Sequence, residues 1–367
     1  MKRILVLIKG LGRGGAEQLL LNAAPYLDRS RFDYRIAYLL PWKNALVSDL
    51  KRQGLPVHCL NADGGLGWVP RLRRLVKEYE IDLVHTHSPV PAVAVRLTLG
   101  LKSPKRVYTE HNVWERFHPA TYWANLLTFP RSEHVFAVSN HVRKSIKYPV
   151  PLRFMHRPPV ETLYHGPDPA LVKTWAMSDG VRAELAIPED ALVVGTVANF
   201  KHHKGYPYLI QAAALVRQEM PNVRFVLIGL GPLENEMRRK AAALGVDDIV
   251  IFAGYREDVP RVAGTFDLFA LPSIHEGLSI ALVEAMTLGK PAVVTDVGGL
   301  PEVISHEKHG FVIPARNEKL LAEAIIKLLS DEDLRREFGE NARRKAATFD
   351  IRNAVRRMEE VYSELLA

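Results

Sequence analysis

The chain has 367 residues, of which 47% are hydrophobic and 25% are charged. This length predicts two or three domains, and the composition is typical of a folded globular protein rather than a disordered one. No run of about 18 apolar residues occurs, so we expect no transmembrane helix. The one cysteine, Cys59, excludes an internal disulfide and favours a cytoplasmic location.

The formal net charge of +8 is unevenly distributed between the two halves. Residues 1–165 contain 25 Lys and Arg against 12 Asp and Glu, whereas residues 166–367 contain 24 against 29. A basic half favours an anionic partner, either the inner face of a membrane contacted peripherally or a phosphorylated acceptor, and an ordinary solvated basic surface is equally compatible. Nucleic acid is not expected, because no aromatic interleaving or reading motif accompanies the charge.

Short apolar runs alternate with amphipathic segments along the chain, which predicts βα units around parallel sheets. The predicted strands of the first half are residues 4–8, 34–39, 83–86, 106–109 and 135–138. Those of the second half are residues 192–198, 223–229, 249–252, 267–271, 292–295 and 311–313. Each half therefore has the pattern of a Rossmann-type α/β domain.

Turn-forming residues between 157 and 190 predict the boundary between the halves. We expect a first domain of residues 1–165 and a second of residues 166–349, with a last helix over 350–367 that crosses back to the first. A helix over 68–79 has an apolar face and a basic face. The apolar face either packs on the sheet or lies on an anionic membrane.

A glycine-rich loop follows the first predicted strand and precedes a helix. Gly10, Gly12 and Gly15 satisfy the G-x-G-x-x-G pattern of dinucleotide sites. That use also requires an acidic residue at the end of the second strand to hold the ribose. The second strand instead runs into Leu40-Pro41-Trp42, which disfavours a nicotinamide cofactor.

A second loop of the same kind opens the second half, where Lys204 precedes Gly205. An ammonium group just before a helix can bind a phosphate, because its charge and the helix dipole act together. Surface loops often carry lysine, so this signal alone is weak.

The segment around Glu276 and Glu284 carries the strongest signal. Ser279 is a suitable N-cap, so the backbone N–H groups near it are available to a diphosphate. Glu284 is the only charge in the apolar stretch 280–288, and an unpaired buried carboxylate is costly, so we expect hydrogen-bonding partners such as ribose hydroxyls. The alternative is that Glu284 meets a backbone amide and Glu276 is merely exposed.

Glu276 and Glu284 also have the E-x7-E spacing of glycosyltransferase family 4, and the chain resembles this family over essentially its whole length. The resemblance implies the GT-B fold, two Rossmann-like domains facing across a cleft, and transfer with retention of configuration. The other matching motifs are Gly14-Gly15-Ala16-Glu17, Thr109-Glu110-His111-Asn112, Val138-Ser139, His165-Gly166-Pro167-Asp168, Lys204-Gly205, Gly229-x-Gly231-Pro232, Gly254-Tyr255 and Val297-Gly298-Gly299-Leu300-Pro301-Glu302.

By matching position, the resemblance also implies roles for individual residues. The family pattern gives Glu284 the donor ribose, Glu276 the hydroxyls of the transferred sugar, and Lys204 the diphosphate. It implies catalytic roles for His111, Glu276 and Lys204, with His111 contacting a hydroxyl of the reacting sugar. The implied donor-binding residues are Gly14, Gly15, Asn199, Lys204, Tyr255, Arg256, Glu276, Gly277, Leu278, Ser279 and Glu284.

Two positions depart from the family pattern. Asn199 stands where the family often has an arginine, which leaves Lys204 as the main positive phosphate ligand. His165 replaces the asparagine of the usual hinge. No Asp-x-Asp pair or His/Cys cluster has metal-ligand spacing, so we expect no metal cofactor. His85 and His87 end a strand, where they either line the acceptor site or serve the structure.

These observations predict a retaining glycosyltransferase that moves a sugar from a nucleoside-diphosphate sugar to a saccharide, lipid-linked or other small-molecule acceptor in glycan, glycolipid or polysaccharide biosynthesis. The loops around residues 64–65, 114–118 and Trp123 are expected to select the acceptor. Two alternatives stay open: an epimerase or hydrolase of the same fold, and a non-catalytic nucleotide-sugar-binding protein. No motif identifies the base, the sugar or the acceptor.

Overall fold

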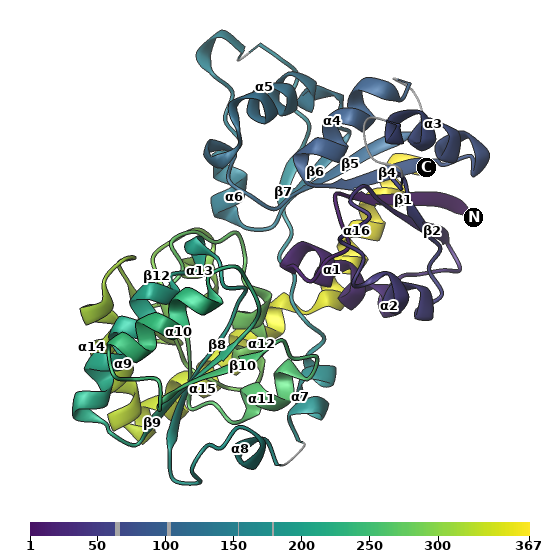
Figure 1. Cartoon of the computed structure of the whole chain (residues 1–367). Coiled ribbons are helices and arrows are strands. Elements are labelled where there is room, and N and C mark those ends of the chain that lie inside the picture. The colour runs from purple at the N-terminus through teal and green to yellow at the C-terminus, as the bar shows by residue number, and fades with distance from the viewer. Residues whose placement is uncertain (63–66, 101–103, 153, 178–179) are drawn as a thin grey trace. The chain divides into compact units, whose positions relative to one another are not determined.

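A computed structural model describes residues 1–62, 67–100, 104–152, 154–177 and 180–367 (Figure 1). The chain divides into two compact units. The first consists of Met1–His165 with Ile351–Ala367, and the second of Gly166–Asp350. Residues 64–65, which we expected to help select the acceptor, lie outside the described part of the chain. Acceptor binding by the first unit and donor binding by the second remain predictions.

The first unit contains one parallel sheet in the order β3-β2-β1-β4-β5-β6-β7. Its strands are β1 (Lys2–Ile8), β2 (Phe32–Tyr38), β3 (Val57–Cys59), β4 (Leu83–His87), β5 (Lys105–Glu110), β6 (His134–Ala137) and β7 (Val160–Thr162). Its helices are α1 (Gly15–Ala23), α2 (Val47–Arg52), α3 (Trp68–Glu78), α4 (Pro89–Thr98), α5 (Pro119–Thr128), α6 (Asn140–Ser145) and α16 (Ile351–Leu366), with short 3-10 turns η1 (Ala24–Tyr26), η2 (Trp114–Arg116), η3 (Phe129–Arg131) and η4 (Val150–Leu152).

The second unit contains a parallel sheet in the order β10-β9-β8-β11-β12-β13. Its strands are β8 (Leu192–Val197), β9 (Val223–Ile228), β10 (Val250–Gly254), β11 (Leu268–Leu271), β12 (Ala292–Thr295) and β13 (Gly310–Ile313). Its helices are α7 (Pro169–Ala176), α8 (Val181–Glu184), α9 (Tyr206–Glu219), α10 (Glu234–Ala243), α11 (Val259–Gly264), α12 (Ile280–Thr287), α13 (Leu300–Val303), α14 (Glu318–Ser330) and α15 (Glu332–Ala346), with 3-10 turns η5 (His202–Lys204) and η6 (Ala347–Phe349).

Every strand predicted from the sequence is present, and no end is shifted by more than two residues. The sequence analysis missed β3 and β7, which are the two edge strands of the first sheet. Each has three residues, and so short a run carries too little alternation to be recognised. Cys59 lies in β3 and is partly buried.

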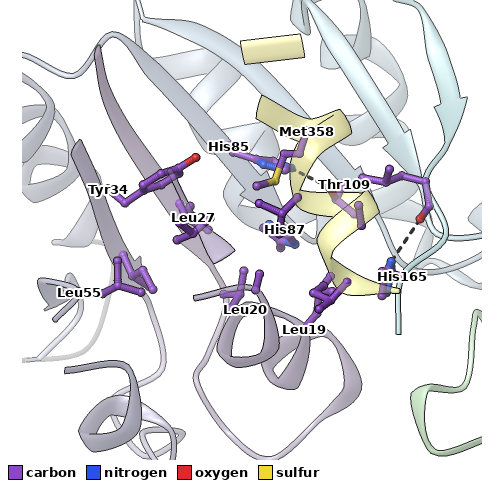
Figure 2. Close-up of a pocket in the computed structure, with 17 residues that line it drawn as sticks. Leu19, Leu20, Leu27, Tyr34, Leu55, His85, His87, Thr109, His165 and Met358 are labelled. Atoms are coloured by element: carbon purple, nitrogen blue, oxygen red, sulfur yellow. Dashed lines mark hydrogen bonds between the residues drawn. The ribbon is translucent and has the colours of Figure 1, made fainter. Parts of the chain in front are cut away.

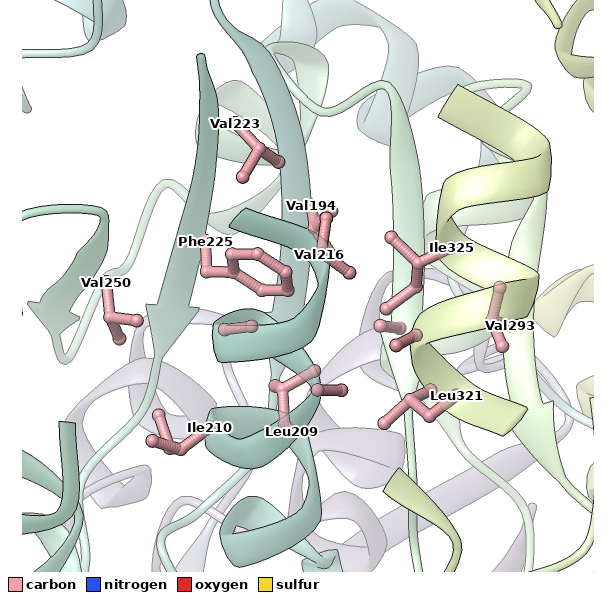
Figure 3. Close-up of a cluster of buried hydrophobic side chains, with 14 of the residues drawn as sticks. Val194, Leu209, Ile210, Val216, Val223, Phe225, Val250, Val293, Leu321 and Ile325 are labelled. Atoms are coloured by element: carbon pink, nitrogen blue, oxygen red, sulfur yellow. The ribbon is translucent and has the colours of Figure 1, made fainter. Parts of the chain in front are cut away.

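Apolar side chains facing the second sheet form a buried core (Figure 3). Leu209, Ile210 and Val216 of α9 pack with Phe225 of β9 and Ile325 of α14. Full burial of each such side chain contributes roughly 1.5–3 kcal/mol. This packing fixes the strands whose carboxyl ends carry the site described below.

Two helices of the first unit settle questions left by the sequence. The helix predicted over 68–79 is α3, and its residues Trp68, Leu72 and Leu75 are buried in the core of the unit. The alternative that its apolar face lies on a membrane is therefore wrong. The last helix, α16, packs beside α1 within the first unit (Figure 1). None of the helices in the described part of the chain is long and apolar enough to cross a membrane.

Candidate active site

The strand order of the second sheet reverses between its neighbours β8 and β11. From β8 the chain proceeds to β9 and β10 on one side, and from β11 to β12 and β13 on the other. Loops that leave such a switch point diverge, and open α/β sheets bind ligands in the crevice at the carboxyl ends of these strands. Lys204 follows β8, while Glu276 and Ser279 follow β11. The fold thus brings together residues that are about 70 positions apart in the chain.

Glycines let three loops meet at this edge. Gly205 has φ +72°, and a Cβ on it would lie 1.8 Å from the carbonyl oxygen of Pro272. Gly298, after β12, has φ +59°, and a Cβ there would lie 1.7 Å from the carbonyl oxygen of Glu276. The N–H of Ile274 donates to the carbonyl of His203 at 2.7 Å. The loop that carries Glu276 is therefore held between its two neighbours.

Lys204 and Glu276 form an ion pair at this junction. The Lys204 Nζ to Glu276 Oε2 distance is 2.5 Å, and the two side chains are 17% and 11% exposed. The Ser273 hydroxyl donates to the same carboxylate oxygen at 3.3 Å. Glu276 is thus not a merely exposed carboxylate, which contradicts one half of the alternative considered above.

The loop ends at Ser279, which caps α12. Its Oγ accepts a hydrogen bond from the N–H of Leu282 at 3.3 Å, so the predicted N-cap is confirmed. Within the described ranges, no group accepts from the backbone N–H of Gly277, Leu278 or Ser279. Such groups at a helix N-terminus favour an anion.

Glu284 lies one turn further along α12. Its neighbours Leu282, Val283 and Ala285 are buried, while Glu284 itself is partly accessible. No donor in the described part of the chain contacts its carboxylate, so the alternative of a backbone amide partner is wrong as well. Burial raises the pKa of Glu284 to about 7. A ligand that brings a hydrogen-bond donor would therefore stabilise the ionised form of this carboxylate.

Three further predicted residues lie on neighbouring loops. Asn199 follows β8 and is partly buried, and its side-chain amide makes no hydrogen bond to a described group. Tyr255 follows β10 and is 38% exposed. The Arg256 guanidinium beside it is held by two carboxylates, Asp258 and Glu184, so this side chain stabilises the loop. Base recognition through the backbone at 255–256 stays a prediction.

His111 belongs to a histidine cluster at the carboxyl edge of the first sheet. It directly follows β5, and its Nε2 lies 3.0 Å from Nδ1 of His87, at the end of β4. The rings of His85 and His87 stack with centroids 4.5 Å apart, and His165 lies edge-on to His111 at 6.4 Å. His85 in turn contacts the Thr109 hydroxyl at 2.7 Å and the Tyr362 hydroxyl of α16.

Comparisons with known proteins cover both units. The family model "Glycosyltransferase Family 4" matches residues 13–171, and "Glycosyl transferases group 1" matches residues 178–345. The chain belongs to glycosyltransferase family 4. It transfers a sugar from a nucleotide sugar to an acceptor, as members of this family do in glycan biosynthesis.

Individual relatives agree with this assignment. EpsD of Bacillus subtilis is 27% identical over 80% of this chain and 79% of its own. The alpha-D-kanosaminyltransferase of Streptomyces kanamyceticus is 28% identical over 83% of each chain. The crystal structure of HepE from Anabaena in complex with UDP is similar to the whole molecule, with a TM-score of 0.84 and 25% identity over 99% of this chain and 100% of that chain. The two sheets thus form the GT-B fold of this glycosyltransferase.

The four histidines of this cluster have lowered pKa values, which favour their neutral forms at pH 7. Burial lowers the pKa of His111 and of His87 well below the usual value, and neighbouring histidines lower both further. Burial likewise lowers the pKa of His85 to about 3 and that of His165 to about 4. A neutral His111 can donate or accept a hydrogen bond but carries no charge.

Apolar side chains of α1 and α16 lie beside the histidine cluster and contribute to this burial. An apolar cavity of about 50 Å³ lies between α1, α16 and the sheet, lined by leucines such as Leu19 and Leu27 (Figure 2). His85, His87 and His165 form its polar side together with Thr109. Water gains little by entering such a lining, so charging any of these rings is disfavoured.

Sequence reasoning gave no role to Glu110, which anchors the turn that carries His111. Its carboxylate is fully buried and accepts hydrogen bonds from the Tyr108 hydroxyl at 2.6 Å, the Trp114 indole at 2.9 Å and the Asn112 N–H at 3.1 Å. Burial raises the pKa of Glu110 to about 7 in spite of these donors. The available signal was a carboxylate at the end of an apolar strand.

Gly14 and Gly15, at the start of α1, have different surroundings. A Cβ on Gly14 would lie 2.4 Å from Glu17 Oε2, whereas one on Gly15 would meet nothing within 4 Å. The first unit itself therefore does not require glycine at 15. Their contact with the donor stays a prediction.

Proposed function

We propose that this enzyme uses a UDP-sugar as donor, retains the anomeric configuration and requires no metal ion. The observation that carries the proposal is Glu284, a shielded carboxylate with no donor from the described protein at the switch point of the second sheet. A ribose supplies two vicinal hydroxyl donors, which suit this carboxylate. The nearby N–H groups of the Ser279 turn suit the adjoining diphosphate.

Lys204 supports the part of the proposal that concerns the leaving group. A nucleoside diphosphate gains negative charge as the glycosidic bond breaks, and an ammonium group beside it stabilises this charge. Lys204 is held by Glu276 at 2.5 Å before any ligand binds. When a diphosphate draws the ammonium toward itself, the Glu276 carboxylate becomes free to accept from hydroxyls of the sugar. Lys204 and the amides then supply the positive charge that a metal ion supplies in other transferases.

The first unit contributes His111 in this proposal. Its Nδ1 makes no hydrogen bond to a described residue, while its Nε2 is occupied by His87. Two neutral rings that share one hydrogen bond couple their tautomers, because one ring must donate and the other must accept. His111 thus offers one defined ring nitrogen to a hydroxyl of the reacting sugar, and His87 positions it. No residue is assigned as a nucleophile.

The choice of UDP rests on a structural neighbour. The Anabaena protein HepE is described in complexes with UDP and with UDP-glucose, and it is 25% identical to this chain in each. The loop after β10, with Tyr255 and Arg256, is the segment proposed to contact the base. The acceptor is proposed to be a saccharide or a lipid-linked or other small molecule.

A thermal-shift panel of UDP, GDP, ADP and their sugars tests the donor. UDP and a UDP-sugar should raise the melting temperature of the wild type, and neither should do so in Glu284→Ala. If no nucleotide stabilises the wild type, the proposed function fails. NMR of the first sugar released from the preferred donor should show the anomer of the donor, and activity should persist in excess EDTA.

A further inference from the structure

Arg96, near the end of α4, is an arginine in the interior of the first unit. It lies on the helix that packs against α5, η3 and β5 (Figure 1), and only 1% of the residue is exposed. Arginine is almost never buried to this degree unless a carboxylate pairs with it. No carboxylate in the described part of the chain forms an ion pair with Arg96. Its charge must therefore be balanced at longer range, or it remains a cost to the fold.

The direct partners of the guanidinium group are neutral. Nε donates to the Ser132 hydroxyl at 2.9 Å, and Nη1 donates to the Asn125 oxygen Oδ1 at 2.7 Å. Nη2 is buried and makes no hydrogen bond to a described group. The backbone carbonyl of Arg96 accepts at 2.9 Å from Arg131, which is exposed to solvent. Burial lowers the pKa of Arg96 to about 10, so the group still carries its charge at pH 7.

A tyrosine ring separates Arg96 from a carboxylate. The Arg96 Cζ lies 4.7 Å from the centre of the Tyr108 ring, within the range of a cation–π contact, and 5.2 Å from that of Phe129. The hydroxyl of the same Tyr108 donates to Glu110 Oε2 at 2.6 Å. Tyr108 therefore presents its ring to the cation and its O–H to the carboxylate. Opposite charges attract strongly across such a separation in a low-dielectric interior.

The other titratable groups that act on the buried arginine supply no competing negative charge. Burial raises the pKa of Tyr108 and of Tyr148, so both phenols are neutral at pH 7. Arg106 has its own partner, because its Nη2 lies 2.8 Å from Glu133 Oε1. The carboxylate of Glu110 therefore remains as the counter-charge of the buried arginine.

The ionised form of Glu110 is the one that suits the turn before His111. Its Oε2 accepts from Tyr108 and Trp114, and its Oε1 accepts from the Asn112 N–H, so both oxygens act as acceptors. Protonation would add a fourth donor where three donors already point. Burial raises the pKa of Glu110, whereas these three donors and the buried arginine lower it. The arginine thus acts in the same direction as the hydrogen bonds that hold the turn.

We propose that Arg96 is a positioning residue for the transfer reaction. Its buried charge balances the Glu110 carboxylate through the Tyr108 ring, and this carboxylate holds the turn that places His111 at the reacting sugar. The part of the inference that concerns His111 rests on the proposed function. The coupling between the arginine and the carboxylate can be measured without turnover.

The indole N–H of Trp114 reports on the charge of Glu110, because it donates to this carboxylate at 2.9 Å. Its NMR resonance in the full chain, assigned by its absence in Trp114→Phe, should move with pH in the wild type with a midpoint near 7. Arg96→Met keeps the length of the side chain and removes the charge, so the midpoint should rise by about one pH unit or more. Arg96→Lys restores the charge and should return the midpoint toward the wild-type value. If Arg96→Met does not fold, Arg96→Gln replaces it with the same expected shift.

The matched control is Ser132→Ala, which removes the acceptor of Arg96 Nε and leaves the charge in place. The melting temperature of this variant should fall, because a buried donor loses its partner. The Trp114 midpoint should stay at the wild-type value. If Arg96 were only a tether between helices, its own variants would likewise lower the melting temperature without moving this midpoint.

The pH profile of kcat at saturating donor distinguishes positioning from folding. Its acidic limb should move to higher pH in Arg96→Met by the same amount as the Trp114 midpoint, and most of the lost activity should return at about pH 9. Glu284 also titrates near pH 7, but it belongs to the second unit and is unchanged in this variant. The difference between the two profiles therefore reports on Glu110.

Three results would overturn the inference. One is a Trp114 midpoint that is equal in the wild type and Arg96→Met, and another is an Arg96→Lys variant that titrates like Arg96→Met. The third is a midpoint that moves while the pH profile of kcat does not, which would separate the Arg96–Glu110 pair from His111. A wild type that transfers no sugar from any UDP-sugar contradicts the proposed function instead, and the NMR titration still tests the coupling.

Discussion

Each sheet carries a carboxylate with a raised pKa near its switch point, Glu110 in the first and Glu284 in the second, and Glu110 is fully buried whereas Glu284 is partly accessible. Burial raises the pKa of both Glu110 and Glu284 to about 7. Glu110 accepts three hydrogen bonds from its own unit, whereas Glu284 receives none from the described residues. The two carboxylates have similarly raised pKa values but different surroundings: Glu110 holds a turn in place, whereas Glu284 is the one that we propose to bind the donor.

The same contrast holds for the positive groups. In the second unit Lys204 is paired with Glu276 before any donor binds, whereas in the first unit Arg96 forms no ion pair with a described carboxylate. The ion pair positions the Lys204 ammonium group in advance, but a bound diphosphate must then compete with Glu276 for it. Each of the following variants breaks one side of this comparison.

The largest effect is expected for Lys204→Ala. Loss of the ammonium that stabilises the leaving diphosphate should lower kcat by about 10²–10³-fold. Lys201→Ala is the matched control, because this exposed lysine lies in the same loop and forms no ion pair. Steady-state kinetics of UDP release measures both. Equal activity in the two variants would contradict the role of Lys204.

Truncation of Glu110 and truncation of Glu284 should have different effects on stability. Glu110→Ala leaves a hydroxyl, an indole N–H and a backbone N–H without an acceptor, which should lower the free energy of unfolding by about 3 kcal/mol or more. Glu284→Ala removes a carboxylate that has no such partners, so its stability at pH 8 should not fall. Urea unfolding at pH 8 measures both.

The raised pKa of Glu284 determines how its effect on the free energy of unfolding changes with pH. Glu284 titrates near pH 4.5 when unfolded and near 7 when folded, so its charge destabilises the fold by up to about 3 kcal/mol above pH 7. This destabilisation disappears as the pH falls through 7 toward 4.5. The advantage of Glu284→Gln over the wild type should therefore be present at pH 8 and absent at pH 4.5. An advantage that is the same at both pH values would contradict the raised pKa.

A smaller effect is expected at His87. His87→Leu removes the partner of His111 Nε2 and should lower kcat about tenfold with the donor KM little changed. His87→Asn can place its amide where Nδ1 lies and should recover most of this loss. Equal activity of the two variants would indicate that His87 serves packing alone. Melting temperatures of both variants distinguish loss of positioning from loss of folding.

The sequence predicted the elements and the polar groups but not their pairings. Strands of four or more residues and the Ser279 cap follow from local pattern, and Glu284 was recognised because a charge interrupts an apolar helix. The pair Lys204–Glu276 joins two loops, and His87 meets His111 because β4 and β5 lie side by side in register. Such contacts depend on sheet order, which no local pattern contains.

The smallest expected effect is proton release on UDP binding. It distinguishes Glu284, which is proposed to bind the donor, from Glu110, which is bonded within its own unit. Ribose hydroxyls hydrogen-bond best to ionised Glu284, so UDP binding should lower its pKa. At pH 7, where Glu284 is about half protonated, binding should release about half a proton. Calorimetry in buffers of different ionisation enthalpy measures this number. Glu284→Gln should abolish the release, whereas Tyr108→Phe, which removes one donor from Glu110, should leave it unchanged. Proton uptake, or release that persists in Glu284→Gln, would contradict the assignment of Glu284 to the donor.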